Sequence, residues 1–434
     1  MEQRYPKFTP EMKKTHTILI PNMAVTQFRL IQQVMKLEGY HCEILGNCGS
    51  QVAQLGLKYV HNDTCYPALL VIGQFLDALN SGRYDLDHTA LLITQTGGGC
   101  RASNYIHLLR KALIKAGYPQ IPVASFNFSG LERGSGFRLT AAMAHRLLAC
   151  VFYGDLLTAL RNQVFPYENI RGEADRLLEN WISRLGELFA QGKGFTVRAM
   201  GKLFSVIAHE FAAVPVTKTP RIKVGVVGEI YVKYSPLGNN NLQRFLENQG
   251  CEVNLPGLLG FCQYCIFNMG EDYILYGGKK IKKAVSDLLL SYLDKIECRM
   301  LRALSEAGFY APGSFKELVH KPNGIISNGA KMGEGWLLTA EMIELVQGGY
   351  ENIVCAQPFG CLPNHIVGKG MINKIRAQYP DANITPIDYD PGATRVNQEN
   401  RIKLMLAVAK ERMETYMEEA VPKRHDHVLQ EVAV

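Results

Sequence analysis

The strongest constraint on the fold is the alternation of short, β-branched apolar runs with segments of helical periodicity. In the first third of the chain "THTILIPNM" precedes "AVTQFRLIQQVMKLEGY", "HTALLITQTGGG" precedes "CRASNYIHLLRKALIKAGY", and "IPVASFNFSG" follows. This alternation is typical of βαβ units, in which helices connect parallel strands and cover the sheet. It returns between "RIKVGVVGEIYVKY" and "ANITPIDYD". The sequence therefore predicts two α/β parts.

The stretch between these two parts is helical in pattern almost throughout, as in "EADRLLENWISRLGELFAQG". A chain of 434 residues is also too long for one ordinary core and suits two or three domains. We expect an α/β fold with two parallel-sheet domains, flavodoxin-like or Rossmann-like, joined by a helical connector. The expected boundaries are residues 1–146, a connector over 147–220, a second domain over 221–410, and a C-terminal helix and tail over 411–434.

Composition narrows the class of protein. Hydrophobic residues make up 47% of the chain and charged residues 20%, as in soluble globular proteins. The N-terminus "MEQRYPKFTPEMKKTH" lacks the apolar core of a signal peptide, and no uncharged apolar run of about 18 residues would span a bilayer. The net charge of +7 is not gathered into a basic block, so we expect no nucleic acid or membrane partner. The prediction is a cytoplasmic protein.

Eleven cysteines stand out in such a chain, because cytosolic thiols stay reduced. Three of them follow an apolar, strand-like run and precede a helical segment: Cys65 in "YVHNDTC", Cys100 in "LLITQTGGGC" and Cys361 in "NIVCAQPFGC". Carboxyl ends of parallel strands share one edge of the sheet, where such folds bind ligands. A helix N-terminus also favours a thiolate or an anionic cluster. These positions predict metal ligands or nucleophiles, against the alternative of cysteines that only pack in a core.

Three thiols from distant segments suit an iron–sulfur cubane with one iron that lacks a cysteine, whereas zinc sites usually show paired CxxC spacings. The neighbouring glycines Gly97, Gly98, Gly99 and Gly360 fit neither a P-loop nor a GxGxxG pattern. We expect them to let the backbone approach a cluster and donate N–H groups to its sulfides.

Further candidates are less specific. Cys355 lies on the strand before Cys361 and is a possible additional ligand. Cys262 and Cys265 form a CxxC in "LGFCQYCIFN", which fits a redox pair, a metal site or two buried helix residues one turn apart. Glu334, in "NGAKMGEGWLLTAEM", precedes a helix, so this segment suits either a loop over the site or a helix-capping turn.

Six ordered segments also carry a family resemblance. They are "GLKYVHNDTCYPALLVIGQFLDAL", "TQTGGGCRASNYI", "KVGVVGEIYVKY", "NGAKMGEGWLLTAEM", "AQPFGCLPNHIVGKG" and "ITPIDYDPGATRVNQENRIKLML". Together, from about Leu55 to Ala407, they resemble the acyl-CoA dehydratase activase-related proteins, which are allied to the 2-hydroxyacyl-CoA dehydratases and the double-cubane cluster proteins. In the dehydratases three cysteines bind a 4Fe–4S cluster. Their order and separation resemble those of Cys65, Cys100 and Cys361.

The resemblance implies a function. It implies an iron–sulfur lyase or reductase of anaerobic metabolism, which receives low-potential electrons from an ATP-hydrolysing activator and performs a reductive or radical dehydration. This chain shows no ATPase motif, so the activator would be a separate protein. An acyl-CoA or another small molecule would be the substrate, and a homodimer or heterodimer the assembly.

Two alternatives stay open. In one, Cys262, Cys265 and Cys355 join the other three cysteines to hold an 8Fe–9S double cubane that reduces small molecules. In the other, the protein is a non-catalytic electron carrier or a partner in cluster maturation. Cysteines that lie far apart in the fold would instead indicate a metal-free binding protein.

Overall fold

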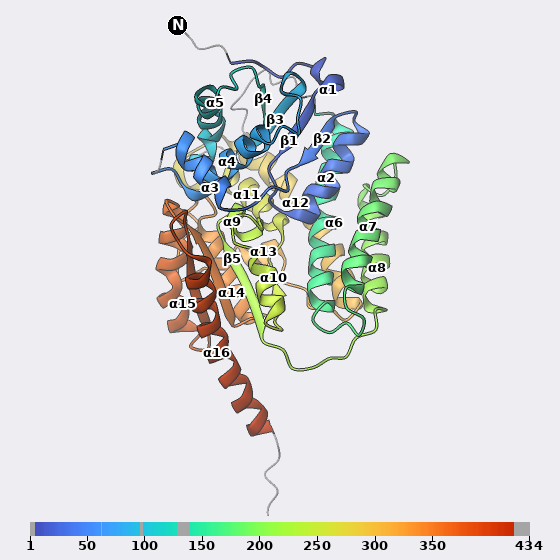
Figure 1. The fold of residues 1–434 in the computed structure, drawn as a ribbon. Coiled ribbons are helices and arrows are strands. Elements are labelled where there is room, and N and C mark those ends of the chain that lie inside the picture. Colours follow the sequence, from blue (N-terminus) through green and yellow to red (C-terminus); the bar gives the residue numbers. More distant parts are fainter. Residues whose placement is uncertain (1–4, 62, 96–98, 128–136, 138, 421–434) are drawn as a thin grey trace, which may run out of the picture.

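The computed structural model describes residues 5–61, 63–95, 99–127, 137 and 139–420. It confirms the α/β class, because it contains two four-stranded sheets in which every strand pair is parallel (Figure 1). In spatial order the first sheet consists of β2 (His41–Ile44), β1 (Thr17–Ile20), β3 (Thr89–Gln95) and β4 (Val123–Asn127). The second consists of β6 (Glu252–Asn254), β5 (Lys223–Gly228), β7 (Asn352–Pro358) and β8 (Asn383–Tyr389).

Both sheets have the same strand order, and this order decides where a ligand can bind. In each sheet the first strand in sequence lies between the second and third, so the chain direction across the sheet reverses between β1 and β3 and between β5 and β7. Helices leave to opposite faces on the two sides of such a point and open a crevice at the carboxyl edge. Cys100 follows β3 and Cys361 follows β7, at these two reversal points.

Helices α3 (Ser50–Tyr59) and α4 (Tyr66–Asn80) correct one expectation, because Cys65 follows a helix and not a strand-like run. The reason is the spacing of Val52 and Gly56, which puts both on the one face of α3 that packs on α4. Gly73 of α4 lies so close to α3 that a Cβ there would be 1.9 Å from the Val52 carbonyl oxygen. This contact sets the position of α4 and of Cys65 at its N-terminus.

We predict that Gly73→Ala lowers the free energy of unfolding by about 1–3 kcal/mol, the usual cost of overpacking a core. The added methyl group meets backbone atoms of Val52, so α3 must move as a whole. Gly260→Ala is the matched control, because Gly260 is also helical and nothing lies within 4 Å of the position its Cβ would take. Urea unfolding of the two variants tests this, and equal stabilities would contradict it.

The helical connector consists of α6 (Ala141–Val164), α7 (Glu173–Ala190) and α8 (Val197–Ala212), which lie together on one side of the molecule (Figure 1). Two helices from the C-terminal half, α11 (Leu258–Tyr276) and α12 (Lys280–Glu306), pack on it. The helical part therefore draws on both halves of the chain.

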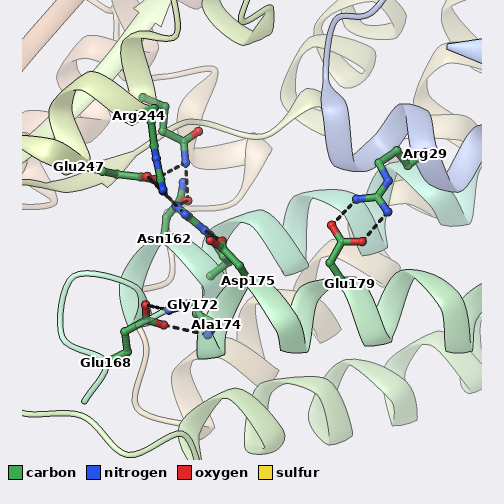
Figure 2. Close-up of polar contacts among 11 residues, drawn as sticks. Arg29, Asn162, Glu168, Gly172, Ala174, Asp175, Glu179, Arg244 and Glu247 are labelled. Atoms are coloured by element: carbon green, nitrogen blue, oxygen red, sulfur yellow. Dashed lines mark hydrogen bonds and ion pairs between the residues drawn. The ribbon is translucent and has the colours of Figure 1, made fainter. Parts of the chain in front are cut away.

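Ion pairs join the connector to helices of both sheet domains (Figure 2). Arg161 on α6 donates from Nε to Asp175 at 2.6 Å and also pairs with Glu247 on α10 (Leu242–Asn248) of the second sheet domain. Arg29 on α2 (Val25–Leu37), beside the first sheet, forms a two-point ion pair with Glu179 on α7. Arg161 is buried and the Arg29 pair is exposed, so removing one partner of the Arg161 network should lower the free energy of unfolding more than removing one partner of the Arg29 pair.

The remaining helices complete the two sheet domains. Residues 411–420 of the expected C-terminal helix and tail are the end of one continuous helix, α16 (Arg395–Ala420), which extends away from the body of the protein (Figure 1). Residues 421–434 lie outside the described residues. The other helical elements are α1 (Met12–Thr15), η1 (Leu86–His88), η2 (Arg101–Asn104), α5 (Tyr105–Ala116), α9 (Ile230–Tyr234), α13 (Phe315–Leu318), α14 (Trp336–Gln347), η3 (Asn364–Gly368), η4 (Lys369–Met371) and α15 (Ile372–Gln378).

One described helix, α6, is long and apolar enough to cross a membrane by length and composition alone. Of its most apolar window, 56% is buried inside the protein, and the helix carries the buried charges Asp155 and Arg161. Core helices of globular proteins pass the same test, so this is weak evidence for a membrane span.

Candidate metal centre

The carboxyl edges of the two sheets meet, and this junction brings together the three main candidate ligands, Cys65, Cys100 and Cys361. A backbone hydrogen bond of 2.9 Å from Tyr66 N–H to the Phe359 carbonyl joins the start of α4 to the loop after β7. Apolar residues of β3 and β7, such as Ile93 and Ala356, belong to one continuous core. The site is therefore built from both halves of the chain.

Cys65 is the N-cap of α4 and is 6% exposed. Its Sγ lies 3.1 Å from the Tyr105 hydroxyl, a hydrogen-bonding distance. Burial raises the pKa of the Cys65 thiol, while the hydrogen bonds from Tyr105 and from the Ala68 N–H oppose that shift. The helix start thus supplies donors to this sulfur but does not by itself make it a thiolate.

Cys100 is the N-cap of η2, and Cys361 lies just after β7, where it is 9% exposed. Burial is the main cause that raises the pKa of Cys100 to about 12, and the charges of Glu334, Glu229 and Cys65 add to it. Burial also raises the pKa of Cys361, with further contributions from Glu334, Glu229 and Cys100. Cys100 therefore lies within electrostatic reach of both other thiols, and the Glu229 carboxyl group influences all three, whereas Glu334 influences Cys100 and Cys361.

Sequence reasoning missed Glu229 and gave Glu334 two alternatives. Glu229 follows β5 and caps α9 by accepting a hydrogen bond from the Val232 N–H at 2.8 Å. Glu334 accepts from the Ile230 N–H at 2.9 Å, so it also contacts the start of α9. Both are buried, and burial together with the charge of Glu334 raises the pKa of Glu229 to about 8. Glu229 also follows a strand at a reversal point, the signal that would have found it.

The segment that contains Glu334 bridges the loops of the two sheets. A Cβ on Gly99 would lie 2.5 Å from the Met332 sulfur, and a Cβ on Gly333 would lie 3.1 Å from Pro363. The segment therefore spans from the Cys100 loop to the Cys361 loop. Of the two sequence interpretations, this geometry matches the loop over the site, although Glu334 also contributes to the start of α9.

Two of the four predicted glycines can be placed against the site. Gly360 has φ +73°, which favours glycine, and its Cβ position is 3.1 Å from the Cys65 Cα. Gly99 is held against Met332. Gly97 and Gly98 lie outside the described residues. A cofactor-binding role stays a prediction for all four.

The additional candidate cysteines lie in different surroundings. Cys355 is fully buried in the core around β7, and burial raises its pKa to about 12, while the Gln357 side chain opposes this shift. The charges that act on Cys355 are those of Asp388, Glu341 and Lys369. Cys262 and Cys265 are one turn apart on α11, as the helical alternative expected, but they are not buried as it also expected, because Cys262 is half-buried and Cys265 is exposed. Burial and then the charge of Glu334 raise the pKa of Cys265 to about 12.

A cavity of about 410 Å³ lies between α2, α6 and the segment from α9 to α10. Its lining includes Gln27, Asp155, Arg161, Lys233 and Arg244. Helix α9 connects the two features, because Glu229 caps its start and Lys233 lies near its end.

Among the described residues, no three histidine, cysteine, aspartate or glutamate side chains are grouped as ligands of a single metal ion. A cubane binds each thiolate through a different iron, so its ligands are more widely spaced than those of one ion. No protein-family model matches this chain, and no curated protein does.

Proposed function

We propose that the protein holds a 4Fe–4S cluster on Cys65, Cys100 and Cys361 and uses it in a reductive or radical reaction of the dehydratase type. The observation that carries the proposal is the convergence of three cysteines from separate segments at the junction of two parallel sheets. Cysteines that only pack in a core have no reason to gather at the ligand-binding edges of both sheets.

The donor set fits such a cluster chemically. The three thiols, buried at Cys65 and Cys361 and partly buried at Cys100, have raised pKa values and are uncharged without a metal, whereas iron would stabilise each as a thiolate. Tyr105 and the Ala68 N–H donate toward Cys65, and the Asn364 amide donates to Cys361 Sγ at 3.5 Å. Hydrogen bonds to cluster sulfurs tune its potential. When bound, the cluster would accept and pass on single electrons at low potential.

The six sequence motifs support the wider assignment. Their resemblance to dehydratase-related proteins suggests a cytoplasmic protein of anaerobic metabolism with a separate ATP-hydrolysing activator as electron donor. Under this proposal the substrate is an acyl-CoA or another small molecule, and the protein works as a homodimer or heterodimer. A non-catalytic role in electron transfer or cluster maturation would use the same cysteines.

A single cubane is favoured over a double one because of Cys355. A double cubane would need Cys262, Cys265 and Cys355 to join the other three cysteines. Cys265 shares the influence of Glu334 with Cys100 and Cys361, but Cys355 packs in a separate apolar core.

The test is iron and acid-labile sulfide per chain after strictly anaerobic purification, with an EPR spectrum of the reduced protein. We expect about four of each for a single cubane. Cys100→Ala should lose both, while Cys298→Ala, at an exposed position on α12, should keep them. About eight irons would indicate the double cubane. No iron, even after reconstitution, would contradict the proposal.

A further inference from the structure

Three cysteines leave one iron of a cubane without a protein ligand, and a buried carboxyl group lies beside them. We propose that the Glu334 carboxylate is the fourth protein ligand of the cluster. This inference rests on the proposed cluster and goes beyond it, because it replaces an open, solvent-accessible iron with one that the protein closes.

The first argument is a shared hydrogen-bond donor. The side-chain amide nitrogen of Asn364 donates to Glu334 Oε2 at 3.2 Å and to Cys361 Sγ at 3.5 Å. The carboxylate oxygen and the sulfur can therefore be no farther apart than the sum of these two distances. Two acceptors on one amide group face the same small volume, which is the arrangement that two ligands of one cluster require.

The second argument is that the backbone fixes Glu334 in place. Gly335, the next residue, has φ +47°, and its Cβ position would lie 2.3 Å from the Ala330 carbonyl oxygen, so this turn is closely packed. The Trp336 N–H donates to the same Ala330 oxygen at 2.7 Å, and the Trp336 side chain is fully buried. A ligand needs this kind of support, because its position must hold while the metal changes charge.

The third argument is charge. Glu334 is 6% exposed, and no ion pair involves its carboxylate among the described residues. Lys233, a cation that influences it, already donates to both carboxylate oxygens of Glu341. A buried carboxylate without a counter-ion is costly, and an iron ion would supply the missing positive charge.

Glu229 is the less suitable of the two carboxylates. Both carboxylates accept from the N-terminus of α9, Glu229 from the Val232 N–H and Glu334 from the Ile230 N–H. Among the described residues only Glu334 shares a donor, the Asn364 amide, with a cysteine. A purely structural role for Glu334, as a second acceptor for the start of α9, is the competing explanation.

Oxygen-17 labelling separates these explanations. The full-length protein is purified anaerobically, reduced and examined by EPR in water enriched in oxygen-17, which broadens the signal if water binds an iron. We expect no broadening in the wild type, broadening in Glu334→Gln, and no broadening in the control Glu229→Gln. Glutamine keeps an acceptor for the Ile230 N–H but cannot be an anionic ligand. On mild oxidation Glu334→Gln should also lose iron several-fold faster than the wild type.

Each outcome has a definite meaning. Broadening in the wild type would show a water-bound iron and overturn the inference while leaving the cluster in place. An unbroadened Glu334→Gln signal would give Glu334 the structural role. Absence of iron and sulfide from the wild type would instead overturn the proposed function itself. The wild-type measurement decides the matter even if the variant does not fold.

Discussion

Replacing Lys233 by methionine should lower the free energy of unfolding by about 3–5 kcal/mol, the cost of removing one partner of a buried ion pair. Lys233 Nζ donates to both carboxylate oxygens of Glu341, at 2.9 and 3.1 Å, and each side chain is 5% exposed. Without the ammonium group the carboxylate stays buried with no counter-ion. Urea unfolding under reducing conditions measures the loss.

The pH dependence of this loss identifies its cause. Burial raises the pKa of Glu341 even with Lys233 present, and removing the lysine should raise it further. An acid whose pKa is higher in the folded state binds a proton more tightly there, so its stability contribution falls as pH rises toward that pKa. The deficit of Lys233→Met should therefore be larger at about pH 8 than at about pH 5.

A double variant is the control for lost packing. In Lys233→Met, Glu341→Met both charges are gone, and apolar replacement of a buried pair is often neutral or stabilising. We expect it to regain most of the lost stability. If it is no more stable than the single variant, the cause is packing around the cavity that Lys233 lines, and the ion-pair explanation is wrong.

The sequence predicted the α/β class and the strands that precede Cys100 and Cys361, because β3 and β7 are buried, β-branched runs. It did not single out β2, since only one of the residues His41–Ile44 is fully buried and the pattern is correspondingly weak. It assigned a strand-like run before Cys65, where α3 lies. A short apolar stretch such as "LKYV" fits either state, and packing on α4 decided for the helix.

In the candidate site too, some residues can be predicted from local sequence pattern and others only from tertiary contacts. Cysteines that follow strands can be placed from local pattern alone, because the edge of a parallel sheet is a local consequence of strand and helix order. Tyr105 and Asn364 could not be assigned to the site in this way, since their roles depend on side-chain contacts that no local pattern shows, Tyr105 with Cys65 and Asn364 with Cys361 and Glu334. The sequence records such residues, but only the tertiary structure shows which of them meet.

Glu297→Gln should stabilise the protein by up to about 3 kcal/mol at pH values above 7. Glu297 on α12 is buried and accepts hydrogen bonds from the Gln263 side chain at 2.7 Å and from the Phe315 N–H at 3.1 Å. Burial raises its pKa to about 7, compared with an ordinary value of 4.5. The folded state thus holds this proton more tightly than the unfolded state does. Stability falls as pH rises from about 4.5 to 7, where the buried group must ionise.

Glutamine can keep the hydrogen bonds without the charge. Its oxygen can accept from the Phe315 N–H, and its amide can donate to the Gln263 side-chain oxygen, which lacks a partner at present, once the Gln263 amide turns over. The gain should be large at about pH 8 and small at about pH 5, because at pH 5 the buried Glu297 carboxyl group of the wild type is almost fully protonated. The same change at the exposed Glu187 on α7 is the control. If Glu297→Gln lowers stability equally at both pH values, the ionised carboxylate is a required acceptor and burial is not what limits stability here.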